Sequence, residues 1–245
     1  MFWQNPLELS RAVLTSIGTH INLIYSNRIP VDSTMLVVSN HRSFMDAPLL
    51  MAALNQPIRF AYHHYISQVP VLRETVGALG GFPLEATNQR QQLFFQQASH
   101  FLQTRQIVGI FPEGSQPMVQ PGTLNKVGDF RRGFAHLAMR SPLPKLAVLP
   151  VAIASQAESI FPGVPLPLLR FFDPSEPLFN QLGWHPLILY HRVQILVGRP
   201  YWITLDEQKK YRGKLGKVIV NELTHYCQTE ISDLLHNAGG QNAKD

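Results

Sequence analysis

Short apolar runs alternate with helical stretches from residue 34 to residue 111, and this alternation most constrains what the chain folds into. The β-rich runs lie at 34–38, 58–62, 81–85 and 106–111. Helices are predicted between them at 46–54, 68–78 and 88–104. Consecutive parallel strands need a long crossover, and a helix usually supplies it. The pattern therefore predicts an α/β fold with a mixed, largely parallel open sheet flanked by helices.

The remaining chain completes one domain of this kind. A helix at 131–140, strands at 145–153 and 192–198, and a closing helix at 214–236 follow the alternating part. A chain of 245 residues does not force a division into two cores. We therefore expect a single domain, whose main part covers residues 31–240.

Residues 1–30 are expected to contain an amphipathic helix. It is predicted from Pro6 to Tyr25, with Asn5 as the candidate cap and the proline at the first helical position. Its apolar stripe consists of Leu9, Val13, Ile17, Ile21 and Ile24. Such a stripe suits a helix packed on its own core, and it also suits a helix at a membrane interface.

The segment 158–191 fits neither a regular strand nor a regular helix. It is crowded with proline, phenylalanine and leucine, and it contains Trp184. One interpretation is a long ordered loop that covers the core. The other is an apolar lid or a membrane-facing surface beside a groove for an acyl chain.

Composition points to an anionic partner and a reducing compartment. The formal net charge is +5, which suits phospholipid or nucleic acid, although nucleic-acid binding has only this charge in its favour. Cys227 is the single cysteine, so a disulfide framework is excluded and a cytoplasmic location is expected. The N-terminal residues do not resemble a signal peptide, and no apolar run reaches the ~20 residues that cross a bilayer. We expect peripheral membrane contact.

The loop after the first predicted strand carries the first candidate catalytic residues. It reads Asn-His-Arg-Ser-Phe-Met-Asp, with His41 directly after the strand and Asp46 about one helical turn later. A histidine takes a proton from an alcohol, and a carboxylate on its other ring nitrogen fixes the tautomer and stabilises the imidazolium. The alternative is an ordinary capped helix with His41 as a bystander.

A second polar loop follows the strand at 106–111. It reads Pro-Glu-Gly-Ser and places Glu113, Gly114 and Ser115 at another strand end. The ends of parallel strands share one edge of a sheet, so the two loops are expected to converge there. Glu113 is a candidate for orienting a hydroxylated acceptor, while the next two residues offer backbone N–H groups and a small hydroxyl. Alone, this sequence is an ordinary turn.

Together the two loops resemble the phospholipid/glycerol acyltransferases, which include the lysophosphatidate acyltransferases. Residues 80–85 (GGFPLE), 130–133 (FRRG) and 148–151 (VLPV) are similar to further blocks of that family, so the resemblance spans about 34–155. It implies a glycerol-3-phosphate acyltransferase-like fold, with an acyltransferase domain over 31–240. It also implies His41 as general base and Asp46 as its partner. The implied substrate-binding residues are Arg42, Ser43, Glu113, Gly114, Ser115, Arg131, Arg132 and Pro150, the last as a wall of the acyl groove.

Three positions depart from the family. Ala86 and Gln116 stand where the family usually has arginines that hold the phosphate of the acceptor, and His63 stands near the place of a lysine. Burying a phosphate without cationic partners is costly. The departures favour an acceptor without a phosphomonoester, unless Arg131 and Arg132 replace the missing cations.

The reaction implied is transfer of a fatty acyl chain from acyl-CoA or acyl-ACP to a lipid hydroxyl, plausibly of 1-acylglycerol-3-phosphate or a related lysolipid. The alternatives are a glycolipid, isoprenoid or other neutral alcohol as acceptor, or a catalytically retired lipid-binding protein. No bound cofactor and no metal are expected, since His63 and His64 lack the spacing of a metal site. The expected partners are the acceptor, the thioester donor, a membrane surface and acyl carrier protein, without nucleic acid.

Overall fold

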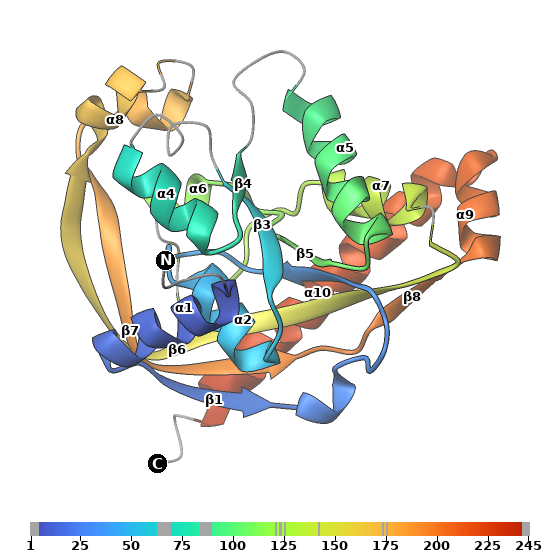
Figure 1. Ribbon diagram of the computed structural model, residues 1–245, viewed down its shortest axis with the longest axis horizontal. Helices are drawn as coiled ribbons and strands as arrows, with labels where there is room; N and C mark the ends of the chain where they lie inside the picture. Colours follow the sequence, from blue (N-terminus) through green and yellow to red (C-terminus); the bar gives the residue numbers. More distant parts are fainter. Residues whose placement is uncertain are drawn as a thin grey trace.

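The computed structural model describes residues 5–62, 70–83, 90–120, 122, 124, 126–141, 143–172, 174 and 176–241. Eight strands form one sheet (Figure 1). They are β1 (His20–Ile24), β2 (Met35–Ser39), β3 (Ile58–Tyr62), β4 (Phe82–Pro83), β5 (Ile107–Ile110), β6 (Lys145–Pro165), β7 (Trp184–Val197) and β8 (Tyr201–Thr204).

Helices cover both faces of this sheet. The α-helices are α1 (Pro6–Ile17), α2 (Asp46–Leu54), α4 (Pro70–Ala78), α5 (Arg90–Gln103), α6 (Gln116–Val119), α7 (Gly133–Arg140), α8 (Leu166–Phe172), α9 (Leu205–Arg212) and α10 (Gly216–Gln241). Two short 3-10 helices are η1 (Ser26–Arg28) and η2 (Pro177–Asn180). Among the described residues, no helix is long and apolar enough to cross a membrane.

The sheet is mixed and mostly parallel. Its strand order is β1-β7-β6-β2-β5-β3-β4, and β8 also pairs with β6. The neighbours from β6 to β4 are parallel, as are β1 and β7, while β7 and β8 run antiparallel to β6. The predicted mixed, largely parallel open sheet flanked by helices is confirmed.

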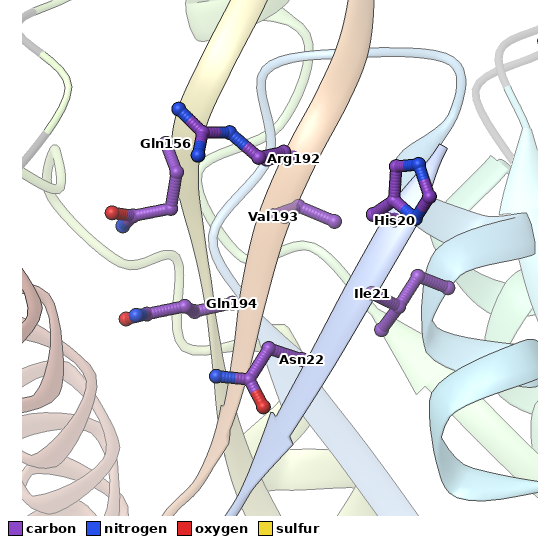
Figure 2. A pocket seen from close by; sticks show the side chains of 7 residues that line it. All are labelled: His20, Ile21, Asn22, Gln156, Arg192, Val193 and Gln194. Atoms are coloured by element: carbon purple, nitrogen blue, oxygen red, sulfur yellow. The ribbon is translucent and has the colours of Figure 1, made fainter. Parts of the chain in front are cut away.

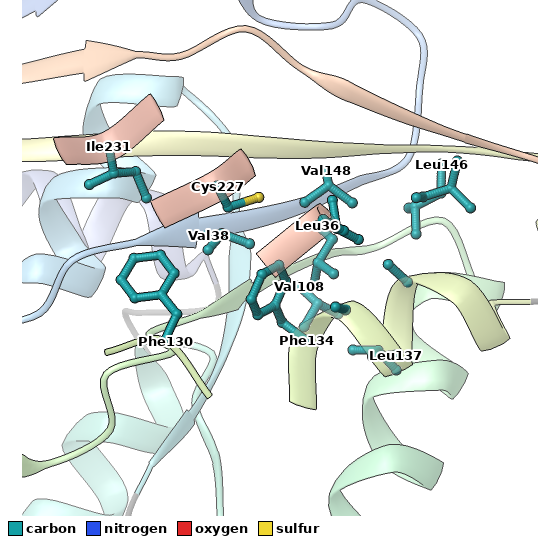
Figure 3. Packing of buried hydrophobic residues seen from close by; sticks show 14 of the residues in the cluster. Leu36, Val38, Val108, Phe130, Phe134, Leu137, Leu146, Val148, Cys227 and Ile231 are labelled. Atoms are coloured by element: carbon teal, nitrogen blue, oxygen red, sulfur yellow. The ribbon is translucent and has the colours of Figure 1, made fainter. Parts of the chain in front are cut away.

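The central strand β2 divides the interior into two cores. All five of its residues are buried, as expected of a strand covered on both faces. Leu36 and Val38 face the core that α5, α7 and α10 cover, where Figure 3 shows them near Phe134 and Cys227. Residues one position away, such as Val37, face the second core beneath α1 and α2. The strand period of two thus places alternate side chains in different cores.

The N-terminal prediction was right for the first part of its helix and wrong for the second. The helix ends at Ile17, because Gly18 takes a left-handed conformation with φ of 76° and caps it. The next residues form β1, which pairs with β7, so this segment belongs to the main sheet. Leu7 and Leu14 of α1 are buried in the core shared with α2. Of the predicted stripe, Ile17 packs against this core, whereas Leu9 and Val13 are only partly buried, so α1 meets the core mainly through a different face from the one predicted.

Both ends of the segment 158–191 are β-structure and α8 and η2 lie between them, contrary to the prediction of an irregular loop. β6 continues to Pro165 and β7 begins at Trp184, so the two strands form a long antiparallel hairpin. Figure 1 shows this hairpin leaving the sheet and ending at α8. Register shifts between Ser155 and Glu158 and again after Pro162 interrupt the alternation that identifies a strand in sequence. We call residues 158–190 the arm.

Candidate active site

The two loops predicted to converge do meet. β2 and β5 are adjacent and parallel, with Val38 opposite Ile110, so both chains leave the sheet at the same edge. The backbone N–H of His41 donates a hydrogen bond to Oε1 of Glu113 over 3.1 Å. The sequence-based expectation that these loops share one rim is confirmed by this contact.

His41 and Asp46 form a close, mostly buried pair. Nδ1 of His41 lies 2.9 Å from Oδ2 of Asp46, and the exposed fractions of the two side chains are 15% and 1%. The same oxygen accepts the backbone N–H groups of Arg42 at 2.7 Å and Ser43 at 2.9 Å. An ionised carboxylate only accepts hydrogen bonds, so the imidazole must carry its proton on Nδ1. This leaves the lone pair of Nε2 available.

The acid of this pair is fixed where α2 begins. Asp46 is the first residue of the helix, and the turn before it closes through a hydrogen bond from its N–H to the carbonyl of Ser43. The positive end of the helix dipole favours a carboxylate at this position. Its second oxygen, Oδ1, is also buried, and the carboxylate hydrogen-bonds with the hydroxyl of Tyr190 from β7.

Aromatic stacking holds the ring of His41. Its centroid lies 4.0 Å from that of Phe111, with the planes 9° apart, and Phe111 stacks in turn on Phe60 at 5.0 Å. Phe60 lies across Gly109 of β5, where an added Cβ would come within 2.1 Å of its ring. The glycine therefore makes room for the stack. These aromatic contacts were not predicted from the sequence, although a glycine within an apolar strand often marks such a close approach.

Asn40 extends the pairing of β2 beyond the end of the strand. Its amide nitrogen donates to the carbonyl of Ile153 at 3.0 Å, and its amide oxygen accepts the N–H of the same residue at 2.8 Å. The side chain thus takes the place of a backbone partner for β6. These two hydrogen bonds fix the position from which the chain leaves the sheet toward His41.

Glu113 fastens the loops together, which differs from the predicted contact with an acceptor. Its side chain is buried, with Oε1 on the N–H of His41 and Oε2 on the N–H of Gly128 at 2.6 Å. Burial raises the pKa of Glu113, while the N–H groups of Gly128 and His41 act in the opposite direction. Both carboxylate oxygens are therefore engaged with backbone.

Arg42 and Ser43 also turn inward instead of offering free groups to a substrate. The guanidinium of Arg42 donates from both terminal nitrogens to Glu158 of the arm, at 3.0 and 3.1 Å. The hydroxyl of Ser43 donates to the carbonyl of Ile188 at 2.7 Å and accepts the N–H of Met45. Both side chains bind the loop to the arm, because burial requires a partner for each polar group.

The arm adds residues that sequence analysis did not place at the site. Tyr190 is buried beside Asp46, and burial, followed by the negative charge of Asp46, raises the pKa of its hydroxyl. Burial lowers the pKa of His185, and the charge of His41 lowers it further. The hydrogen bond from Nδ1 of His185 to the carbonyl of Pro186 acts in the opposite direction. Both groups are thus favoured in their neutral forms.

Gly114 and Arg131 lie together on the second loop. Gly114 has φ of 77°, and its N–H closes a turn on the carbonyl of Phe111 at 3.1 Å. The Arg131 guanidinium packs over this glycine, where a Cβ would lie 3.1 Å from Cζ. The Arg131 N–H donates to Pro112 at 3.0 Å, which joins its segment to the turn. Ser115 directly precedes α6.

Two other predicted site residues lie apart from this group. Arg132 is exposed at the start of α7. Pro150 is buried within β6 opposite Val38, and its carbonyl accepts the N–H of Gly198. Among the described residues, no contact joins Pro150 to the His41 loop. The role of Pro150 as a wall of the acyl groove stays a prediction. His63, His64 and residues 84–86 lie outside the described residues.

A separate hollow opens along β1, β6 and β7. It has a volume of about 570 Å³, and its lining does not include the His41 or Glu113 loops. Figure 2 shows the polar side chains that project from these strands. They are His20, Asn22, Gln156, Arg192 and Gln194. Within the described residues, no group of three histidine, cysteine or acidic side chains is arranged to hold a metal ion.

Comparison with known families decides the identity. A sequence-family model described as Acyltransferase matches residues 20–154, more than half of the chain and the part that carries both loops. The chain belongs to the Acyltransferase family. The predicted family and the predicted enzyme class, an O-acyltransferase, are confirmed. The comparison with curated protein sequences found no match for this acyltransferase.

A solved structure has the same fold as this acyltransferase. It is the 1-acyl-sn-glycerophosphate (LPA) acyltransferase PlsC from Thermotoga maritima, with a TM-score of 0.59 and 18% sequence identity. The match covers 96% of the present chain and 78% of the other. At this identity the likeness supports the fold, and the acceptor of the present enzyme has to be argued from its own residues.

The stack beneath His41 gives a first testable prediction. Gly109→Ala places a methyl group inside the ring of Phe60, and overpacking of this kind typically costs about 1–3 kcal/mol. Chemical unfolding should show this loss. Gly77→Ala is the matched control, because nothing lies within 4 Å of an added Cβ there and alanine favours a helix by roughly 0.5–1 kcal/mol over glycine. Equal unfolding free energies for the two variants would contradict the arrangement of the stack.

Proposed function

We propose that this enzyme transfers a fatty acyl chain from an acyl-CoA or acyl-ACP thioester to a lipid hydroxyl in one direct step. The observation that carries the proposal is the orientation of His41, whose Nδ1 faces Asp46 and whose Nε2 is left for the substrate. His41 removes the hydroxyl proton as the oxygen attacks the thioester carbonyl. The C–O bond forms, the C–S bond breaks, and the thiolate takes the proton back from the imidazolium.

The surroundings of the pair support this role. Asp46 is a buried carboxylate with three donors on one oxygen, so it holds the ring in one orientation and stabilises the imidazolium that forms. The stack on Phe111 restricts the ring further. Backbone N–H groups of the two loops are proposed to stabilise the oxyanion. The step needs no bound cofactor, and the thioester is a substrate.

Substitution of the pair tests the chemistry. His41→Ala should lower kcat by on the order of 100-fold to 10,000-fold, because the general base is lost. Asp46→Asn should also cause a large loss, since an amide favours the wrong tautomer and does not stabilise the imidazolium. Transfer of radiolabelled acyl groups to lipid acceptors is the measurement.

The control for these variants is His225→Ala, an exposed histidine on α10. It should keep the activity of the wild type. A folded His41→Ala protein with the kcat of the wild type would refute the mechanism. A wild-type protein that transfers no acyl group would favour the lipid-binding alternative.

The acceptor is proposed to be a lysolipid of the 1-acylglycerol-3-phosphate type. Arg131 supports this choice, because its guanidinium packs over Gly114 and makes no ion pair with a described residue. A planar guanidinium binds two phosphate oxygens at once. Gln116, exposed at the start of α6, favours the second candidate, a neutral lipid alcohol, because it offers no charge.

Competition between the two acceptor classes tests this proposal. With lysophosphatidate and an uncharged lipid alcohol present together, the wild type should prefer the phosphate-bearing acceptor. Arg131→Gln should lower kcat/KM for that acceptor by roughly 10-fold to 200-fold, the scale of a lost charged hydrogen bond, and should hardly affect the uncharged one. Arg132→Gln is the control from the neighbouring position. A wild-type preference for the uncharged alcohol would establish the second candidate.

We further propose that the arm binds a membrane surface, where the lipid acceptor resides. Eight large apolar side chains of the arm are exposed: Ile160, Phe161, Val164, Leu168, Phe171, Leu182, Trp184 and Leu187. The sequence of the arm has only four formally charged residues, and one of them, Glu158, is paired at its root. An exposed apolar surface that includes aromatic side chains is typical of interfacial binding. The single cysteine supports the cytoplasmic side of the membrane.

Vesicle flotation tests the arm. The wild type should float with anionic phospholipid vesicles, and Phe171→Ser with Leu182→Ser should weaken this binding at least ~10-fold, given roughly 1.5 kcal/mol for each buried apolar side chain. These residues are 82% and 94% exposed, so their replacement leaves the core intact. The control pair, Val31→Ser with Leu215→Ser, removes exposed apolar residues outside the arm. Equal binding by both double variants, or no flotation of the wild type, would contradict the proposal.

A further inference from the structure

An ion pair joins the arm to the catalytic loop, residues 40–46, and takes no part in the proposed proton transfer. Glu158 faces Arg42 with both carboxylate oxygens, each accepting from one terminal nitrogen of the guanidinium. The side chains are only 12% and 9% exposed. Between Lys145 and Arg170 of the sequence, Glu158 is the sole charged residue. A charge placed in such apolar surroundings is costly unless it is paired.

Two further contacts attach the same loop to the same arm. Ser43 donates its hydroxyl to the carbonyl of Ile188, and the N–H of Tyr190 lies 3.3 Å from the sulfur of Met45. Glu158 and Tyr190 are opposite each other in the hairpin, so all three contacts lie at the root of the arm. Of these three contacts, only the pair of Arg42 and Glu158 consists of charged groups.

The position of Arg42 explains why its charge has to be held. Its own N–H donates to Oδ2 of Asp46, the oxygen that also receives His41. The buried hydroxyl of Tyr190 also hydrogen-bonds with this carboxylate, so the anion lies among the loop, His41 and the arm. A guanidinium released from Glu158 would be drawn to this nearby anion, because opposite charges attract strongly away from water. It would then compete with His41 for Asp46.

We propose that Glu158 is a positioning residue: it holds the Arg42 guanidinium away from Asp46 and keeps the N–H groups of the loop directed at that carboxylate. The consequence for catalysis rests on the proposed function of His41. The effect of Glu158 on the order of the loop does not depend on that function, and amide hydrogen exchange measures it separately. Glu158 acts through Arg42, so its removal should reduce turnover more than substrate binding.

Glu158→Gln keeps the shape of the side chain and removes its charge. Its kcat should fall by about 10-fold to 100-fold, as expected when a catalytic group is misplaced, with little change in KM for either substrate. Amide hydrogen exchange in residues 40–46 should become faster by on the order of 10-fold, because the bonds to Asp46 loosen. Arg42→Gln combined with Glu158→Gln removes the stray cation and should recover much of the lost turnover.

Glu230→Gln is the matched control. Glu230 also pairs with an arginine, Arg28 at 3.9 Å, and its side chain is 16% exposed, but its hydrogen bond goes to the N–H of Arg199 instead of the catalytic loop. The control should leave kcat and exchange in 40–46 unchanged. If Glu158→Gln does not fold, Glu158→Asp, which retracts the carboxylate, should show the same slow turnover and fast exchange.

Three results would overturn the proposal. The first is wild-type kcat and wild-type exchange in a folded Glu158 variant. The second is a higher KM for the acceptor with kcat unchanged, which would make Arg42 a substrate ligand. The third is a double variant no better than the single one. If the wild type itself transfers no acyl group, the proposed function fails, and the exchange rates still decide whether Glu158 holds the loop.

Discussion

Burial of the Asp46 carboxylate is the requirement on which the rest of the site depends. A buried anion is stable only with donors around it, and one oxygen of Asp46 collects two backbone N–H groups and Nδ1 of His41. This arrangement is available because the chain turns sharply between β2 and α2. It orients the histidine and the loop together, so the geometry for proton transfer and the local fold are the same set of contacts.

The neighbouring elements each constrain that turn from a different side. β6 holds its start through Asn40. The loop after β5 places Phe111 beneath the imidazole and holds the His41 N–H through Glu113. The arm holds its outer side through Glu158. The same arm carries eight of the fifteen large apolar side chains that are exposed among the described residues, so the element proposed to meet the lipid is also the one that fixes the catalytic loop. Membrane contact and loop position are thereby connected physically.

Much of this arrangement follows from local sequence patterns, and the rest does not. Uninterrupted apolar strands such as β2, followed by helices, predicted the sheet and the convergence of its polar loops. The arm was missed because register shifts and prolines break the alternation of β6. Arg42 and Glu158 are 116 residues apart in the sequence, so no local sequence pattern predicts their pairing. For the same reason the sequence suggested Glu113 as a substrate ligand, whereas its oxygens are taken by backbone N–H groups brought together only in the folded chain.

The proposed mechanism requires that Nδ1 of His41, and not Nε2, carries the proton in the resting enzyme. Nitrogen-15 NMR of histidine-labelled protein distinguishes the two tautomers, and comparison with His41→Gln identifies the signals among the ten histidines. We expect a protonated Nδ1 and an unprotonated Nε2 for the neutral ring, with this preference lost in Asp46→Ala. A neutral His41 protonated on Nε2 in the wild type would contradict it, because that ring has no lone pair for the acceptor hydroxyl.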